Sequence, residues 1–220
     1  SLEGDKKVVH TQKEKIYGKT VILAAGAVHR KLAVPGEEEL TGRGVSYCAT
    51  CDGAFFRDKT VAVIGGGDVA VEDAIFLARG CKKVYMIHRR DELRAAKSLQ
   101  DALFATPQVE MCWNRTVSEI GGENQVQWIT VDSTVGEESL RLDVDGVFVA
   151  VGITPDTEFV KDLVELDASG YIVAGEDGKT SVPGIYAAGD IRTKPLRQII
   201  TAAADGANCI TSVEEYLRTM

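Results

Sequence analysis

The sequence lacks any long apolar run. No stretch approaches the roughly 20 residues that a membrane-spanning helix needs, and no signal peptide is visible. Positive charge is also scarce, because 25 Lys and Arg residues stand against 33 Asp and Glu residues, which gives a net charge of −8. General nucleic-acid binding requires a basic face. We therefore expect neither a membrane span nor a nucleic-acid partner.

Cysteine is sparse and irregularly spaced. Only five cysteines occur, and a single pair, Cys48 and Cys51, is close in sequence. Secreted disulfide frameworks have an even number of cysteines at regular spacings. An odd number with one close pair is more typical of a reducing compartment. The pattern therefore predicts a cytoplasmic protein with one reactive pair of thiols.

The order of predicted elements indicates two domains. The chain has 220 residues and 45% hydrophobic residues, which is enough for one large domain or two modest ones. Strands and helices alternate in the middle of the chain, as in a parallel sheet, and one of the helices is predicted over 91–105 with Asp91 as its cap. The first and last parts of the chain differ from this middle part, with short strands predicted within 20–25 and 181–190. We expect these terminal segments to pair as a second domain that the first interrupts.

A glycine motif, G-x-G-x-x-A, lies between a predicted strand and a predicted helix. Its members are Gly65, Gly67 and Ala70. The first glycine permits a tight turn, the second lets the backbone approach a pyrophosphate, and the small third residue lets helix and strand pack closely. Asp68 stands at the start of the helix, whose free N–H groups favour a phosphate. The setting predicts a dinucleotide site, and a tight turn without a ligand is the alternative.

The next predicted strand ends in a basic cluster. His88, Arg89 and Arg90 end the strand, and Arg94 follows four residues after Arg90. NAD sites usually carry an acidic residue here, which would repel a phosphate. Guanidinium groups bind a dianionic phosphate through paired hydrogen bonds, and Arg90 and Arg94 share one side if the helix starts near Arg90. The cluster favours NADP(H) over NAD(H), and a solvated basic patch is the alternative.

The Cys48-x-x-Cys51 motif allows redox chemistry, metal binding or a structural role. Structural zinc needs four ligands, often from two such pairs, and neither the other cysteines nor the three histidines show that spacing. A redox role is favoured because a predicted hydride-donor site lies in the same chain. Asp52 can move a proton to or from a thiolate, or it can be a turn residue before Gly53. Because nicotinamide does not normally reduce a disulfide directly, a flavin is the usual intermediate.

The motifs together resemble the low-molecular-weight thioredoxin reductases. Segments occur in that family's order over essentially the whole chain: "GVSYCATCDGAFFRDKTVAVIGGGDVAVEDA", "IHRRDELRA", "GVFVAVGITPDT", "GIYAAGD" and "RQIITAAADG". The resemblance implies NADPH-dependent reduction of a thioredoxin-like protein through FAD and a Cys48–Cys51 redox disulfide. It also implies a homodimer. A related reductase that serves a peroxidase is an alternative.

The resemblance also implies roles for single residues. Cys51 would face the flavin, Cys48 would exchange with thioredoxin, and Asp52 would donate a proton. The turn of Gly189 and Asp190 would contact the ribityl and phosphate region of FAD. Three residues would lie near the isoalloxazine ring: Arg197, Gln198 and Ile199.

The sequence departs from the family in two ways. Val69 and Asp73 stand where serine and glutamate are common, and Val69 removes one hydrogen bond near the pyrophosphate. The FAD-binding βαβ unit that opens the family's chain, with its own glycine motif, is expected to be missing. We predict an α/β fold in which a Rossmann-like NADPH-binding domain (31–152) is inserted in a partial FAD domain of three-layer ββα type (1–30 and 153–220). A truncated NADP-binding fragment without flavin or turnover is the alternative.

Overall fold

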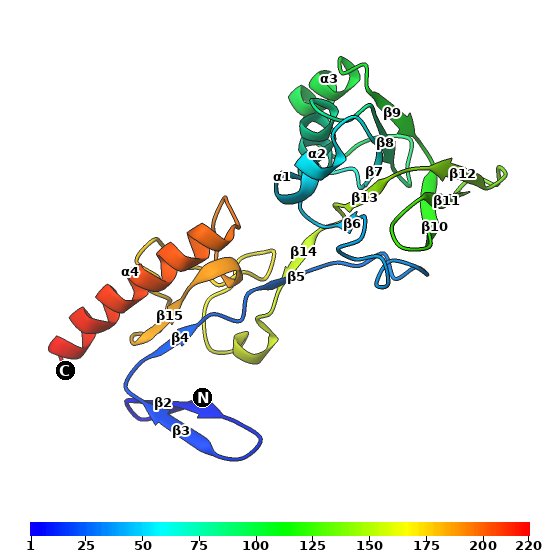
Figure 1. Cartoon of the computed structure of the whole chain (residues 1–220). Coiled ribbons are helices and arrows are strands. Elements are labelled where there is room, and N and C mark those ends of the chain that lie inside the picture. Colours follow the sequence, from blue (N-terminus) through cyan, green and yellow to red (C-terminus); the bar gives the residue numbers. More distant parts are fainter. The chain divides into compact units, whose positions relative to one another are not determined.

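The chain forms two compact units in the computed structural model, which describes residues 1–220 (Figure 1). Unit 1 comprises Ser1–Val28 and Ile153–Met220, and unit 2 comprises His29–Gly152. The chain therefore leaves unit 1 once, builds unit 2 and returns. Each unit buries hydrophobic clusters of its own. Which cofactor each unit binds stays a prediction.

Unit 2 is built on a five-stranded parallel sheet in the order β6-β13-β7-β8-β9. Its strands are β6 (Val45–Ser46), β7 (Thr60–Ile64), β8 (Lys83–Ile87), β9 (Val109–Cys112) and β13 (Gly146–Val149). From β7 the chain adds β8 and β9 on one side, whereas β13 and β6 lie on the other. In open parallel sheets, ligands bind beyond the carboxyl ends of the strands at such a switch of direction.

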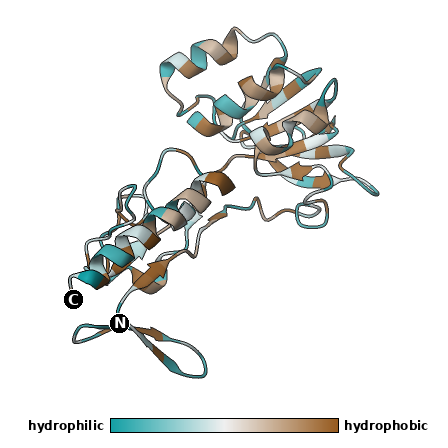
Figure 2. Cartoon of the chain, turned by 60° about the vertical axis from the view of Figure 1, so that its left-hand side comes forward, coloured by the Kyte–Doolittle hydropathy of each residue, from teal (hydrophilic) through white to brown (hydrophobic).

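Both faces of this sheet are covered, which explains why its strands are almost continuously apolar (Figure 2). Val61 and Val63 of β7 pack with the helices, whereas Ala62 and Ile64 pack with a second, antiparallel sheet. The covering elements are α1 (Ala49–Asp52), η1 (Gly53–Phe56), α2 (Asp68–Ala78), α3 (Lys97–Phe104), β10 (Arg115–Gly121), β11 (Trp128–Ser133) and β12 (Leu140–Asp143). The result is a three-layer α/β unit, which confirms the predicted fold class.

Unit 1 joins the two ends of the chain. β4 pairs with β15 in parallel, with Val21 opposite Ile185, and this pairing confirms that the terminal segments associate. Its elements are β1 (Leu2–Glu3), β2 (Lys6–His10), β3 (Lys15–Gly18), β4 (Val21–Leu23), β5 (Ala27–His29, ending in unit 2), β14 (Ile153–Pro155), η2 (Glu158–Val160), β15 (Ile185–Ala187), η3 (Gly189–Ile191) and α4 (Ile199–Arg218). α4 packs against β15 and η3. None of the helices in the structure is both long enough and apolar enough to cross a membrane.

The predicted start of the helix over 91–105 is wrong. The helix α3 begins only at Lys97, and the residue that precedes it is Ala96, so Asp91 does not cap it. Tertiary contacts hold the preceding segment out of the helix. The N–H of Arg94 donates to the carbonyl of Gly66 at 2.8 Å, and a ring nitrogen of His88 lies 2.9 Å from the carbonyl oxygen of Glu92.

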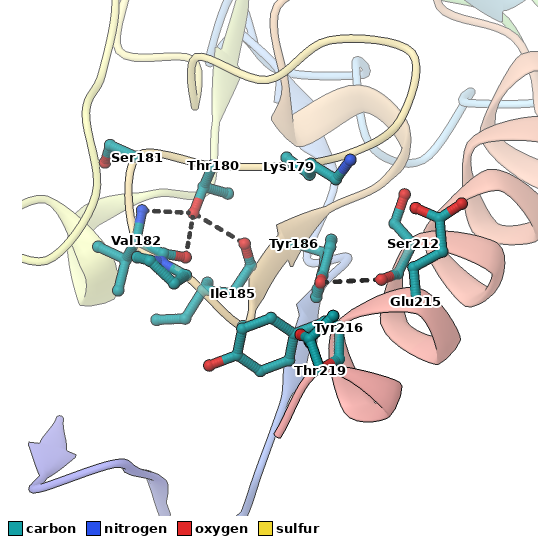
Figure 3. A pocket seen from close by; sticks show the side chains of 12 residues that line it. Lys179, Thr180, Ser181, Val182, Ile185, Tyr186, Ser212, Glu215, Tyr216 and Thr219 are labelled. Carbon is teal, nitrogen blue, oxygen red and sulfur yellow. Dashed lines mark hydrogen bonds between the residues drawn. The ribbon is translucent and has the colours of Figure 1, made fainter.

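Unit 1 also holds a cavity of about 400 Å³ beside the loop before β15 and the last turns of α4 (Figure 3). Several of its polar groups already bond within the protein. The hydroxyl of Thr180 donates to the carbonyl of Ile185, and that of Tyr186 donates to the carbonyl of Ser212. None of the predicted site residues lines this cavity.

Candidate active site

The two close cysteines form a disulfide. Cys48 precedes α1 and Cys51 lies within it, with Cα atoms 5.3 Å apart. The N–H of Cys51 donates to the sulfur of Cys48 at 3.2 Å. Cys48 is half-buried and Cys51 is exposed. Among the alternatives that the spacing allows, the structure shows the two cysteines bonded to each other.

The segment of residues 48–53, which carries the disulfide and is called the redox turn below, packs against α2. Ala49 within the turn and Phe56 after it are buried in the same cluster as Leu77 of α2. Gly53 allows the close approach, because a Cβ atom there would lie 3.0 Å from Leu77 and 3.1 Å from Phe76. The disulfide thus sits on a packed helix, directly after a strand of the parallel sheet.

A hydrogen bond connects Asp52 to the end of β6. The hydroxyl of Ser46, the last residue of β6, donates to Asp52 Oδ2 at 2.6 Å. The same hydroxyl accepts the N–H of Cys48 at 3.1 Å. The sequence reasoning missed Ser46, and the available signal was a hydroxyl residue two residues before the cysteine motif.

The glycine turn follows β7 at the switch point of the sheet. Gly65 has φ +155°, and a Cβ atom there would lie 2.5 Å from the carbonyl oxygen of Ala150 and 2.6 Å from Cβ of Ala70. Internal packing therefore requires both Gly65 and a small residue at 70. Gly67 differs, because a Cβ atom there would meet nothing within 4 Å. The open space at Gly67 fits a ligand that approaches the backbone at the start of α2.

His88 and Gly66 pack against each other beneath the turn. His88 is only 5% exposed, and a Cβ atom on Gly66 would lie 2.2 Å from its ring. Burial lowers the pKa of His88, although hydrogen bonds to the backbone at Glu92 and Gly65 oppose the shift. The neutral ring supports the shape of the turn. The sequence reasoning named His88 and missed Gly66.

The basic cluster lies next to this turn, with its side chains in solvent. Arg89, Arg90 and Arg94 are exposed, and the backbone of each is anchored. Because α3 starts after Arg94, the predicted placement of Arg90 and Arg94 on one side of a helix is wrong. The bond between Arg94 N–H and Gly66 joins the cluster to the turn instead. Three exposed cations beside a glycine turn form a site suited to a phosphate.

Asp68 has a structural contact of its own. Its Oδ1 accepts the N–H of Ala96 at 2.7 Å, which fixes the chain just before α3. The carboxylate also lies in the first turn of α2, whose partial positive charge it stabilises. This contact joins the starts of two helices at the edge of the predicted nucleotide site.

Unit 1 presents a second set of predicted residues around the turn after β15. Gly189 has φ +78°, a backbone conformation that favours glycine. Asp190 Oδ1 and Arg197 Nε are buried without a hydrogen-bond partner. Gln198 caps α4, whereas Ile199 is 92% exposed. Buried polar atoms are nearly always paired, so these two atoms indicate a ligand with its own donors and acceptors.

A buried charge cluster fixes that turn. Asp205 of α4 accepts hydrogen bonds from the N–H of Gly189 at 2.8 Å, from Arg192 at 2.6 and 2.9 Å, and from Lys194 at 2.7 Å. Burial alone would raise the pKa of Asp205, but the hydrogen bonds from Arg192 and Lys194 hold it well below its usual range. The side chains of this trio are almost completely buried. Sequence reasoning did not find these residues, because nothing local indicates that they meet.

Known proteins with similar sequences and a similar fold include several thioredoxin reductases. The family model of pyridine nucleotide-disulphide oxidoreductases matches residues 1–206. The chain is 46% identical to a thioredoxin reductase of Peptoclostridium acidaminophilum over 222 residues, covering 98% of this chain and 70% of that protein. One of Listeria innocua is 47% identical, with 100% and 69% covered. A crystal structure of thioredoxin reductase from Streptococcus pyogenes is 48% identical with a TM-score of 0.95, and the match covers 100% of this chain and 72% of that one.

The fold and the site together define a class of protein: a nucleotide-type parallel sheet that carries a redox-active disulfide at the carboxyl ends of its strands. The family match extends over most of the chain, and the identities lie far above what fold likeness alone would produce. The chain belongs to the pyridine nucleotide-disulphide oxidoreductases. The resemblance inferred from the motifs is thereby confirmed.

Proposed function

We propose that this chain takes part in the NADPH-dependent reduction of a protein disulfide, of thioredoxin type, through FAD and the Cys48–Cys51 disulfide. The observation that carries the proposal is the position of that disulfide. It follows β6 at the same edge of the sheet as the glycine turn that follows β7. The matched relatives named thioredoxin reductase support the choice of substrate.

The nucleotide site would be the turn at Gly65–Gly67 with the start of α2. The N-cap Gly67 has no side-chain hydrogen bond to the helix, so free backbone N–H groups are available to a pyrophosphate. Arg89, Arg90 and Arg94 would bind the 2′-phosphate that distinguishes NADPH from NADH. His88 would support the turn from below through its contact with Gly66.

The flavin site would lie at the turn of Gly189 and Asp190 in unit 1. The unpartnered Asp190 Oδ1 would accept a hydroxyl hydrogen, and the unpartnered Arg197 Nε would donate to an oxygen or nitrogen. When bound, FAD would supply the conversion of a two-electron hydride transfer into disulfide reduction. Gln198 and Ile199 begin α4 beside this turn, where the exposed Ile199 offers apolar contact area.

The chemistry of the chain itself is thiol–disulfide exchange. The reduced Cys48 thiolate would attack a partner disulfide, forming one S–S bond and releasing one partner thiolate. Cys51 would then attack the Cys48 sulfur, which reforms the Cys48–Cys51 disulfide and releases the second partner thiolate. The pair loses two electrons and the partner gains them. The N–H of Cys51 and the hydroxyl of Thr50, 3.4 Å from the Cys48 sulfur, would stabilise the Cys48 thiolate. Asp52 would exchange protons with the departing or attacking sulfur.

A visible absorbance spectrum of the purified protein tests this proposal first. We expect bound flavin, identified after denaturation, whose absorbance NADPH bleaches and an oxidised thioredoxin restores. A colourless protein that still binds NADPH would favour the second candidate, a cofactor-binding fragment without turnover. Reduction of a peroxidase component but not of thioredoxin would redirect the choice of partner.

The cysteine pair has its own test. Cys51→Ser is expected to leave NADPH binding unchanged and to abolish disulfide reduction, because no second thiol can resolve the mixed disulfide. Binding is measured by titration with NADPH, and turnover with a thioredoxin substrate. Cys112→Ser, which removes a thiol outside the pair, is the matched control and should leave both unchanged. Retained turnover in Cys51→Ser would remove the pair from the mechanism.

A further inference from the structure

Ser46 connects the Asp52 carboxyl to the backbone of Cys48 in the redox turn. It is the last residue of β6, is only 6% exposed, and pairs in register with Phe148 of β13, so its backbone is fixed by the sheet. Its hydroxyl donates to Asp52 Oδ2 at 2.6 Å and accepts the N–H of Cys48 at 3.1 Å. One hydroxyl thus joins the carboxyl group and the backbone of the first cysteine.

A hydroxyl is the group that this position requires. It can donate one hydrogen bond and accept another at the same time, which neither an alanine nor a carboxylate can do. A bond from O–H to a carboxylate is charge-assisted and among the stronger ones in proteins. Ser46 is the side chain that the structure shows hydrogen-bonded to the Asp52 carboxyl. Without Ser46, that carboxyl would be free to rotate into solvent on the half-exposed end of α1.

We propose that Ser46 is a positioning residue for proton transfer at the Cys48–Cys51 disulfide and acts through Asp52. It holds the Asp52 carboxyl at the redox turn and stabilises the carboxylate that remains once the proton has left. This inference rests on the proposed role of Asp52 as the proton donor. It assigns the buried strand end, and not only the C-x-x-C loop, to the reaction.

The step can be written for a small dithiol, dithiothreitol. Its thiolate attacks one sulfur of the protein disulfide, the S–S bond breaks, and the other sulfur leaves with the electron pair. That departing thiolate takes the proton of Asp52, whose new carboxylate accepts the Ser46 O–H. The second thiol of the reagent, as its thiolate, then attacks its own sulfur in the mixed disulfide. This step closes a cyclic disulfide and releases the second protein sulfur as a thiolate. The protein disulfide gains two electrons and the reagent loses two.

A double-mutant cycle on the full chain tests the inference without requiring flavin. The rate of reduction of Cys48–Cys51 by dithiothreitol is followed by acid quenching, alkylation and mass measurement. We expect Asp52→Asn to slow the reaction about 10-fold or more, at the lower end of general-acid effects. Ser46→Ala should slow it about 5-fold. The double variant should react no more slowly than Asp52→Asn alone, because Ser46 acts through that carboxyl.

Two further variants separate positioning from mere support of the fold. Ser46→Thr keeps the hydroxyl and should restore most of the rate, and it also serves if Ser46→Ala does not fold. Tyr47→Phe is the matched control, because it removes the hydroxyl of the adjacent residue, which bonds to Glu37 and not to Asp52. Its rate should equal that of the wild type.

The other possible rates would refute different parts of the inference: the role of Ser46, the need for its hydroxyl, or the role of Asp52. A wild-type rate in Ser46→Ala, or effects of Ser46→Ala and Asp52→Asn that multiply in the double variant, would refute the role of Ser46. A slow Ser46→Thr would show that the site responds to shape and not to the hydroxyl. A wild-type rate in Asp52→Asn would refute the role of Asp52 and the inference with it. The reductase activity proposed for the chain would stand or fall separately, by its spectrum.

Discussion

Asp205 shows how a single buried carboxylate can determine the shape of a predicted cofactor turn. It lies in α4, yet it bonds to the backbone of Gly189 and to the side chains of Arg192 and Lys194, which come from the segment after β15. Its charge is satisfied only while the helix and this segment stay together. The cluster therefore links the stability of unit 1 to the geometry around Asp190.

Replacing that carboxylate is expected to destabilise the protein in a pH-dependent way. Asp205→Asn leaves the buried Lys194 without its counter-charge and leaves Arg192 with only the exposed Glu176 as an ion-pair partner, which costs about 3–5 kcal/mol near neutral pH. Because the folded-state pKa of Asp205 is lowered, its contribution is present above the ordinary pKa of about 3.9 and is lost as pH falls through the folded value. The difference from the wild type should therefore shrink in strong acid. Urea unfolding at neutral and acidic pH measures it, and a constant difference would contradict this linkage.

The exposed arginines are expected to determine cofactor choice. Replacing both Arg89 and Arg90 by alanine should weaken NADPH binding by about 10-fold or more, because each charge-assisted hydrogen bond to a phosphate is worth about 1.5–3 kcal/mol. NADH lacks that phosphate, so its affinity should change little. Titration of both nucleotides gives the comparison. Lys82→Ala, at an exposed lysine that precedes β8, is a control that removes one positive charge outside the cluster and should change neither affinity. Equal losses for both nucleotides in the double variant would refute the assignment.

At the scale of elements, the glycine turn separates packing from ligand binding. Gly66→Ala would bring a Cβ atom to 2.2 Å from the buried His88 ring, whereas Gly67→Ala meets nothing within 4 Å. We expect the first variant to lose about 1–3 kcal/mol of unfolding free energy, as overpacked sites do. The second should unfold like the wild type but bind NADPH more weakly. Urea unfolding and nucleotide titration distinguish the two, and a destabilised Gly67→Ala with unchanged binding would contradict this division.

Local patterns predicted the elements whose signals are local. The alternation of strands and helices and the G-x-G-x-x-A spacing identified the parallel sheet and its turn, because period and turn chemistry are written in neighbouring residues. The start of α3 was missed, because the contact of Arg94 with Gly66 overrides the helical pattern from Asp91 onward. Ser46 and Asp205 were missed because their partners are distant in the chain. Asp52 lies six residues from Ser46 and Gly189 lies sixteen residues from Asp205, and each pair meets only after folding.

At the scale of the whole molecule, unit 2 is inserted in the sequence between the two segments of unit 1. The two hydrophobic clusters of unit 2 consist only of residues between 29 and 152, and so do its two sheets. The terminal segments of unit 1 similarly bury clusters drawn only from themselves. Each unit thus has the property that defines a domain, a core of its own.

This separation predicts that unit 2 folds and binds NADPH by itself. A protein of residues 29–152 retains both buried faces of the parallel sheet, the disulfide and the arginine cluster. We expect a single cooperative unfolding transition and an NADPH affinity within about 3-fold of that of the full chain, since every proposed nucleotide contact is internal to the unit. Circular dichroism and nucleotide titration are the measurements, with Arg89→Ala and Arg90→Ala together as the non-binding control. A fragment that unfolds non-cooperatively would show that unit 2 depends on unit 1. A well-folded fragment with much weaker binding would place a missing nucleotide contact outside residues 29–152.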